Sequence, residues 1–92
     1  MKYQSDAEQL YEHLAATAEL PVERSASRLL GEAEAVADDL RGCDPPVIKA
    51  RATVVYELLD QIDETGHEEA DEHLRQARTL AYELASDDPS PE

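Results

Sequence analysis

A chain of 92 residues with a formal charge of −14 is long enough for one small domain, and its acidity argues against binding to nucleic-acid phosphates. Eight Lys and Arg stand against 22 Asp and Glu, and the chain has no Phe, no Trp and only four Tyr. This composition disfavours a large aromatic ligand pocket and a platform for stacking nucleic-acid bases.

Four helices are predicted, at about residues 6–19, 22–41, 45–64 and 67–85, within a single helical domain over residues 1–86. In the first, Ser5 and Glu8 have the spacing of a capping box. Apolar residues then recur three and four positions apart, which places them on one helical face. They are Ala7, Leu10, Tyr11, Leu14 and Ala18.

The second helix is predicted to begin near Pro21, because proline fits the first helical turn, and to end at Gly42. Its apolar residues alternate spacings of four and three, as in a heptad repeat. They are Val22, Ala26, Leu29, Ala33, Val36 and Leu40.

The third helix is expected to start after Asp44, a potential cap, and carries two adjacent apolar stripes, which indicates contact with more than one neighbour. One stripe is Ile48, Ala52, Val55, Leu59 and Ile62, and the other is Val47, Arg51, Val54 and Leu58. Arg51 is expected to pair with a carboxylate such as Glu34 or Asp38.

A capping box at Thr65 and Glu68 is predicted to begin the fourth helix. Residues 87–92 are predicted to form a disordered acidic, proline-containing tail.

The helix pattern predicts an all-α fold, a four-helix bundle of two helical hairpins. The hairpins also resemble each other in sequence, which leaves open a pseudo-symmetric bundle. A shift of 45 residues sets Tyr11 on Tyr56, and a shift of 44 sets Leu30 on Leu74 and Leu40 on Leu84. The alternative is chance, because Ala, Leu and Glu fill amphipathic helices in general.

The surroundings of the protein are also suggested by composition. The acids are spread over both halves, and only Lys2 and Lys49 are lysines, which resembles the proteins of salt-in halophiles, haloarchaea above all. Cys43 is the only cysteine, so no intramolecular disulfide is possible. The N-terminal residues lack the apolar segment of a signal peptide, and no run is long enough to span a membrane, so a cytoplasmic protein is expected.

A metal site is the clearest catalytic alternative. Glu69 and His73 share one face of the fourth helix, and His13 would join them if the first and fourth helices pack together. Glu57 and Asp60 fit the Glu-x-x-Asp motif of all-helical nucleotide pyrophosphohydrolases, which this small acidic chain resembles. No Glu-x-x-Glu precedes that motif here, which puts the resemblance in doubt.

The preferred prediction is a non-enzymatic, self-associating protein-interaction module, expected to form a homodimer and to bind an unidentified protein. Its interaction face is predicted at Val47, Ile48, Val54, Val55, Leu58 and Leu30, because this apolar surface exceeds what a small bundle can bury. No cofactor, nucleic acid or membrane is expected as a partner. The alternative is a metal-binding bundle or metal-dependent hydrolase that uses Glu57, Asp60, Glu69 and His73.

Overall fold

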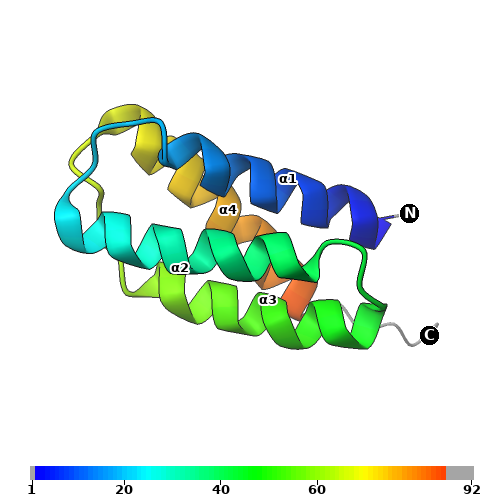
Figure 1. Cartoon of the computed structure of the whole chain (residues 1–92). Coiled ribbons are helices and arrows are strands. Elements are labelled where there is room, and N and C mark those ends of the chain that lie inside the picture. Colours follow the sequence, from blue (N-terminus) through cyan, green and yellow to red (C-terminus); the bar gives the residue numbers. More distant parts are fainter. Residues whose placement is uncertain (1, 87–92) are drawn as a thin grey trace.

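The computed structural model describes residues 2–86, with side chains from Ser5 onward, and folds them into four helices (Figure 1). The helices are α1 (Lys2–Thr17), α2 (Arg24–Leu40), α3 (Pro45–Asp60) and α4 (Glu68–Ser86). No strand occurs in this range, so the predicted all-α class is confirmed. The predicted tail, residues 87–92, lies outside the described residues.

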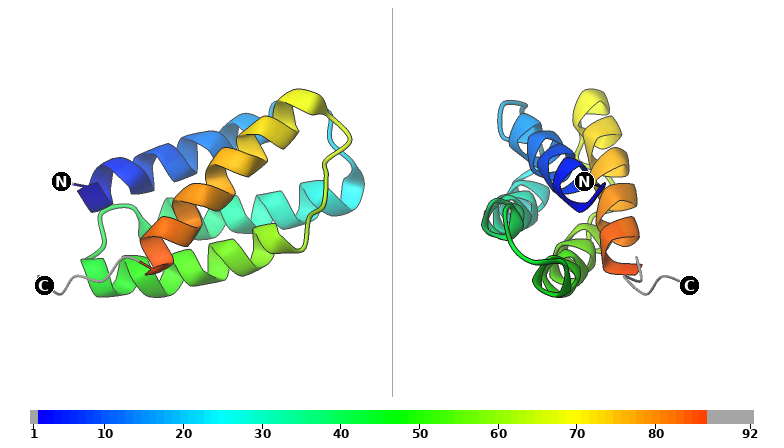
Figure 2. Two further views of the ribbon diagram at one scale, coloured as in Figure 1. Left: turned by 180° about the vertical axis from the view of Figure 1, so that it is seen from behind. Right: turned by 90° about the vertical axis from the view of Figure 1, so that its right-hand side faces the viewer.

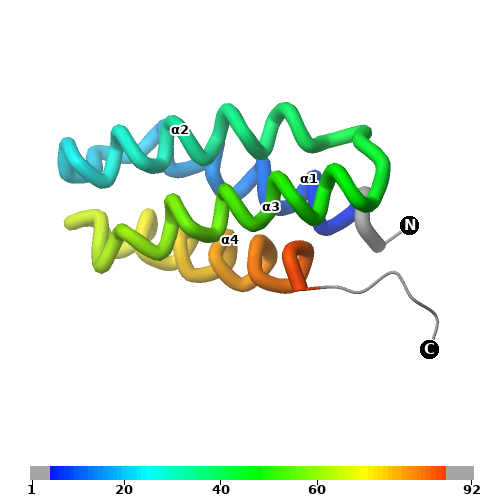
Figure 3. The backbone as a smooth tube through the Cα atoms, turned by 90° about the horizontal axis from the view of Figure 1, so that it is seen from below, coloured from blue at the N-terminus to red at the C-terminus, as the bar shows by residue number. Residues whose placement is uncertain are grey.

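Each helix packs lengthwise against two others, and we call the line along which two helices meet a seam. The seams are α1–α2, α2–α3, α3–α4 and α1–α4, whereas α1 and α3 touch only slightly across the middle. Successive helices run in opposite directions, so the start of α1, the end of α4 and the α2–α3 turn lie at one end of the molecule (Figures 1 and 2). The elongated body, seen from below in Figure 3, measures 41 × 20 × 17 Å.

The core is built from the inner face of every helix, where Ala and Leu recur at spacings of three and four. The small alanines let the helix backbones approach closely, while the leucines fill the space between them. Exposed fractions are 3% or less for all of the following residues: Ala7, Leu10, Leu14, Ala26, Leu30, Ala33, Ala37, Leu40, Ile48, Ala52, Val55, Leu59, Ile62, Ala70, Leu74, Ala77, Ala81 and Leu84.

The first helix begins earlier than the capping box predicts. Ser5 lies inside α1, where its Oγ accepts a hydrogen bond from Gln9 Nε2 at 3.3 Å, so it does not cap the helix. The helix ends at Thr17, whose buried hydroxyl donates to the carbonyl of Leu14 at 2.6 Å. Tighter turns then continue to Leu20, just before Pro21.

The second helix begins at Arg24, two residues later than predicted, because Glu23 belongs to a contact between loops. Its backbone N–H donates to the carbonyl of Thr65 at 2.7 Å, which ties the α1–α2 loop to the α3–α4 loop. At the other end of α2, Gly42 has a φ of 81°, as its predicted role in ending the helix requires. Pro45 then starts α3 as predicted, although the Asp44 side chain makes no capping hydrogen bond.

The third helix ends at Asp60 rather than near residue 64, because α4 supplies a partner for its last carbonyls. Arg78 Nη2 donates to the carbonyls of Leu59 at 3.2 Å and Ile62 at 2.7 Å. These bonds satisfy acceptors that a longer α3 would have satisfied within the helix. Ile62 remains buried after the helix has ended.

The predicted capping box at Thr65 and Glu68 is wrong, because the Thr65 side chain is used inside the loop. Its hydroxyl donates to Asp71 Oδ1 at 2.8 Å, and the same carboxylate oxygen accepts the Thr65 backbone N–H at 2.7 Å. Instead, His67 precedes α4, and its Nδ1 accepts the N–H of Ala70 at 3.4 Å. The loop is therefore anchored to the first turn of the helix that follows it.

Candidate functional sites

Two histidines meet across the α1–α4 seam. His13 Nδ1 and His73 Nδ1 are 2.9 Å apart, and the ring planes are tilted by 50°. Both side chains are half-buried, and they come from opposite ends of the sequence. At this distance the two nitrogens share one hydrogen, so at least one ring accepts through a lone pair.

The charge of this histidine pair depends on burial and on its neighbours. Burial, reinforced by the nearby His73 ring, lowers the pKa of His13 below 6.5, while the Glu12 and Glu72 carboxylates oppose the shift. Removal from water and repulsion by a second imidazolium both disfavour the charged ring. The neutral imidazole, which is the form that accepts hydrogen bonds and binds metals, is thus favoured near neutral pH.

The four residues predicted to bind a metal do not come together. Glu57, Asp60 and Glu69 are exposed, whereas His73 turns into the seam and faces His13. Across the described residues, no group of three or more His, Cys, Asp or Glu side chains is placed to hold a metal ion. The pairing of His13 with His73 is the part of the metal hypothesis that the packing of α1 on α4 supports.

The predicted interaction face needs correction in half of its members. Ile48 and Val55 have no exposed surface, and Leu30 is 3% exposed, so these three belong to the core and are not available to a partner. The third helix has one inner stripe and one outer stripe, and the prediction merged the two. Val47 and Val54 remain exposed, at 40% and 45%, and Leu58 is half-buried beside them.

The outer stripe of α3 borders the α2–α3 seam. Arg51 lies on this stripe, and its Nη1 is 3.3 Å from Asp39 Oδ2 on α2, the residue next to one of its predicted partners. On the α2 side, Leu29 and Val36 are partly buried against the core, as is Leu58 on α3. We call Leu29, Val36, Val47, Val54 and Leu58 the apolar edge.

Aromatic residues occupy the other two seams. Tyr56 and Tyr82 meet at the α3–α4 seam with ring centroids 5.7 Å apart, and Tyr82 is 57% exposed. At the α1–α2 seam, the guanidinium of Arg41 lies 3.9 Å from the Tyr11 ring centroid. The same guanidinium donates hydrogen bonds to the carboxylates of Glu8 and Asp38. The cation is thus enclosed by a π face and two carboxylates, which is a structural arrangement.

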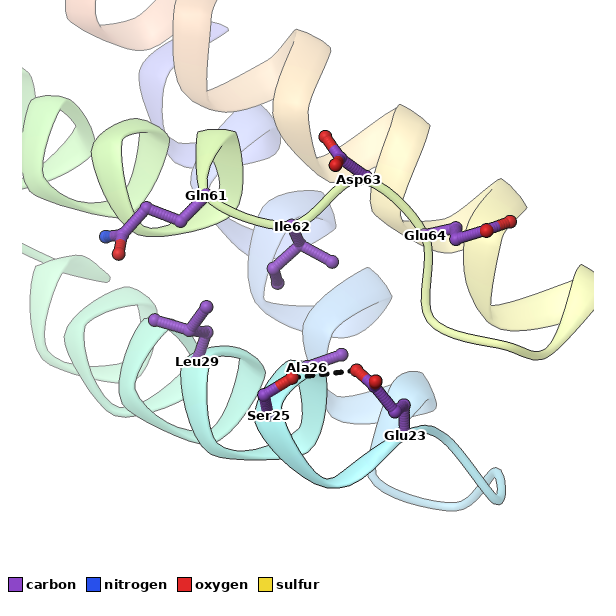
Figure 4. A pocket seen from close by; sticks show the side chains of 8 residues that line it. All are labelled: Glu23, Ser25, Ala26, Leu29, Gln61, Ile62, Asp63 and Glu64. Atoms are coloured by element: carbon purple, nitrogen blue, oxygen red, sulfur yellow. Dashed lines mark hydrogen bonds between the residues drawn. The ribbon is translucent and has the colours of Figure 1, made fainter.

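A cavity of about 300 Å³ lies at the end of the molecule where the two long loops meet (Figure 4). Its polar groups are mainly carboxylates, and the Ser25 hydroxyl donates to Glu23 Oε1 at 2.7 Å. A serine nucleophile needs a base that is itself positioned by a third group, and no histidine lines this cavity. Its lining is Glu23, Ser25, Ala26, Leu29, Gln61, Ile62, Asp63 and Glu64.

Cys43 also has a structural environment. Its thiol donates to the carbonyl of Asp39 at 3.3 Å at the end of α2, and the residue is half-buried. Among residues 2–86, no helix combines the length and apolarity needed to cross a membrane.

These features define a small all-α protein with a histidine pair on one seam and an apolar edge on another. The chain belongs to a family described as "Domain of unknown function (DUF8152)", whose model matches residues 6–90. No curated protein and no solved structure matches the chain.

Proposed function

We propose that this protein is a non-enzymatic interaction module that forms a homodimer through its apolar edge. The observation that supports the proposal is the exposure of Val47 and Val54 on one face of α3, next to the half-buried Leu58. Isolated exposed apolar residues are common on protein surfaces, but a continuous apolar strip is typical of an interaction site. On the neighbouring α2, Leu29 and Val36 are apolar residues that the core leaves partly uncovered.

A second copy of the chain is the partner that this edge suits best. Positions 47, 51, 54 and 58 are separated by four, three and four residues, so the pattern reads the same in both directions. Two copies of α3 that pack antiparallel about a twofold axis would therefore match position for position. The strip is short, which implies a weak, concentration-dependent dimer rather than an obligate one.

Salt would decide whether this dimer forms. Each chain carries a formal charge of −14, so two copies repel each other strongly at low ionic strength. In molar salt the Debye length falls to about 3 Å, and apolar contact at the edge is then opposed much less. The proposal is thus of a cytoplasmic protein adapted to high salt, as in haloarchaea, that associates in that medium.

The proposal includes a pseudo-symmetric bundle made from two related hairpins. A shift of 45 residues sets the buried positions of α1 on those of α3: Ala7, Leu10, Leu14 and Thr17 on Ala52, Val55, Leu59 and Ile62. A shift of 44 sets those of α2 on those of α4: Ala26, Leu30, Ala33, Ala37 and Leu40 on Ala70, Leu74, Ala77, Ala81 and Leu84. The two hairpins are therefore alike in which positions they bury as well as in sequence, and this supports their origin by duplication.

The test is sedimentation in molar KCl over a range of protein concentrations. We expect the wild type to form dimers and Val47→Asp to remain monomeric, because the new carboxylate would be buried against the apolar Leu58 of the second copy. Tyr82→Asp is the matched control, since it adds the same charge at an exposed apolar position on the α3–α4 seam.

Circular dichroism of both variants checks whether they keep their helices. A wild type that stays monomeric in molar salt would overturn the proposal. So would a dimer that persists in Val47→Asp, or one that is lost in Tyr82→Asp but not in Val47→Asp.

A further inference from the structure

The histidine pair at the α1–α4 seam has no part in the proposed dimer. His13 and His73 approach through the same ring atom, Nδ1, from helices that are first and last in the chain. Sixty residues separate them in the sequence. Two imidazole nitrogens that face each other at this distance are the beginning of a coordination sphere, because neutral imidazole binds Zn, Cu and Ni well.

We propose that His13 and His73 form a two-nitrogen site for a divalent transition-metal ion, for which Zn²⁺ is the probe, and that the ion joins α1 to α4. A tetrahedral Zn²⁺ with Zn–N bonds of about 2.0–2.1 Å holds two ligand nitrogens about 3.4 Å apart. The observed separation is 2.9 Å. An opening of about half an ångström, together with a rotation of both rings that turns their nitrogens toward one point beside the line joining them, would therefore admit the ion.

Charge around the pair favours a cation. Glu12 on α1 and Glu72 on α4 both lie close enough to His13 to favour its charged form. Glu72 also accepts hydrogen bonds from Arg75 and Gln76, so water is the expected source of the remaining ligands. The lowered pKa of His13 helps as well, because more of its ring is already neutral near neutral pH and fewer protons have to leave when the metal binds.

Such an ion would act on the fold as a removable cross-link. The α1–α4 seam closes the bundle between its first and last helices, and the ligand pair exists only when that seam is formed. Metal binding would then stabilise the folded state and not the unfolded one, which couples the melting temperature to metal concentration.

The experiment titrates metal-free protein with Zn²⁺ in molar KCl, by calorimetry and by NMR of the histidine rings. High salt matters because it suppresses weak binding to the many surface carboxylates. We expect one ion per chain, shifts of the His13 and His73 resonances, and a higher melting temperature with Zn²⁺. His13→Leu and His73→Leu should each weaken binding by at least about tenfold, since each removes a ligand.

Leucine is the chosen replacement because it occupies comparable half-buried helix positions in this molecule, at Leu29 and Leu58 beside the α2–α3 seam. Both variants are therefore expected to fold. His67→Gln is the control, since it removes a histidine outside the pair. Binding that survives either leucine substitution, or that is lost in His67→Gln, would overturn the site, as would no Zn²⁺-dependent change in the wild type. The site and the dimer fail separately, because Val47→Asp leaves the α1–α4 seam intact.

Discussion

The α1–α4 and α2–α3 seams join the same two hairpins along opposite sides of the molecule, yet their borders differ in chemistry. The first carries His13 and His73, joined nitrogen to nitrogen, with Glu12 and Glu72 beside them. The second carries the apolar edge and one ion pair, between Arg51 and Asp39. Helices that are equivalent in packing thus carry a pair of titratable rings at one border and partly exposed apolar side chains at the other.

The largest effect should come from the core, where the two seams are expected to be alike. Leu14 on α1 and Leu59 on α3 are both fully buried. Leu14→Ala and Leu59→Ala should each lower the free energy of unfolding by about 2–5 kcal/mol, as for other core cavities. Urea unfolding measures both. A much smaller loss for Leu14→Ala would show that α1 is held less firmly than α3. The two seams would then differ in their buried packing as well as in the residues at their borders.

Salt should act on the two seams in opposite directions. Near the histidine pair, Glu12 on α1 and Glu72 on α4 are like charges close to the same His13 ring, whereas Arg51 and Asp39 attract across the α2–α3 seam. Because the whole chain is strongly acidic, relief of repulsion should prevail, and the melting temperature should rise from low to molar KCl. Thermal unfolding followed by circular dichroism tests this. An unchanged melting temperature would mean that the acidity has no role in salt adaptation.

Acidification should weaken only the α1–α4 seam. Because the pKa of His13 in the folded protein lies below 6.5, the unfolded chain takes up its proton first as the pH falls. The contribution of the His13 shift is present above the ordinary pKa of 6.5 and is lost as the pH falls toward the lower pKa of His13 in the folded state. The loss should be about 0.5–1.5 kcal/mol, comparable to one hydrogen bond.

Urea unfolding of metal-free protein between pH 7.5 and 5.5 measures this loss. The double variant His13→Leu/His73→Leu is the control, and it should lose less stability over the same range. An equal loss in both proteins would place the sensitivity outside the histidine pair.

Periodicity was sufficient to predict the helices and their inner faces, because apolar spacing reflects burial directly. Helix ends were less predictable, since tertiary partners decide them. Arg78 reaches across from α4 to the last carbonyls of α3, and Glu23 donates to Thr65 in another loop. Neither partner is close in sequence, so local cap signals at Ser5 and Thr65 were misleading.

The candidate sites show the same limit. Two apolar stripes on α3 were visible in the sequence, but only the packing shows that Ile48 and Val55 point inward while Val47 and Val54 point outward. His13 and His73 come into contact only because α1 packs against α4, and the sequence alone did not show which helices are neighbours. The Glu-x-x-Asp spacing carried less information, because Glu57 and Asp60 lie on an exposed surface.

The smallest effect on folding should come from the apolar edge, which is what separates an interaction surface from a core. Val54→Ser should change the free energy of unfolding of the monomer by no more than about 0.5 kcal/mol, since the side chain is 45% exposed and the two residues have similar helix propensity. Association adds a dependence on concentration. In molar KCl the melting temperature of the wild type should therefore rise with protein concentration, and that of Val54→Ser should stay constant. If neither protein responds to concentration, the apolar edge does not bind a second copy, and the difference between the two seams lies in the histidine pair alone.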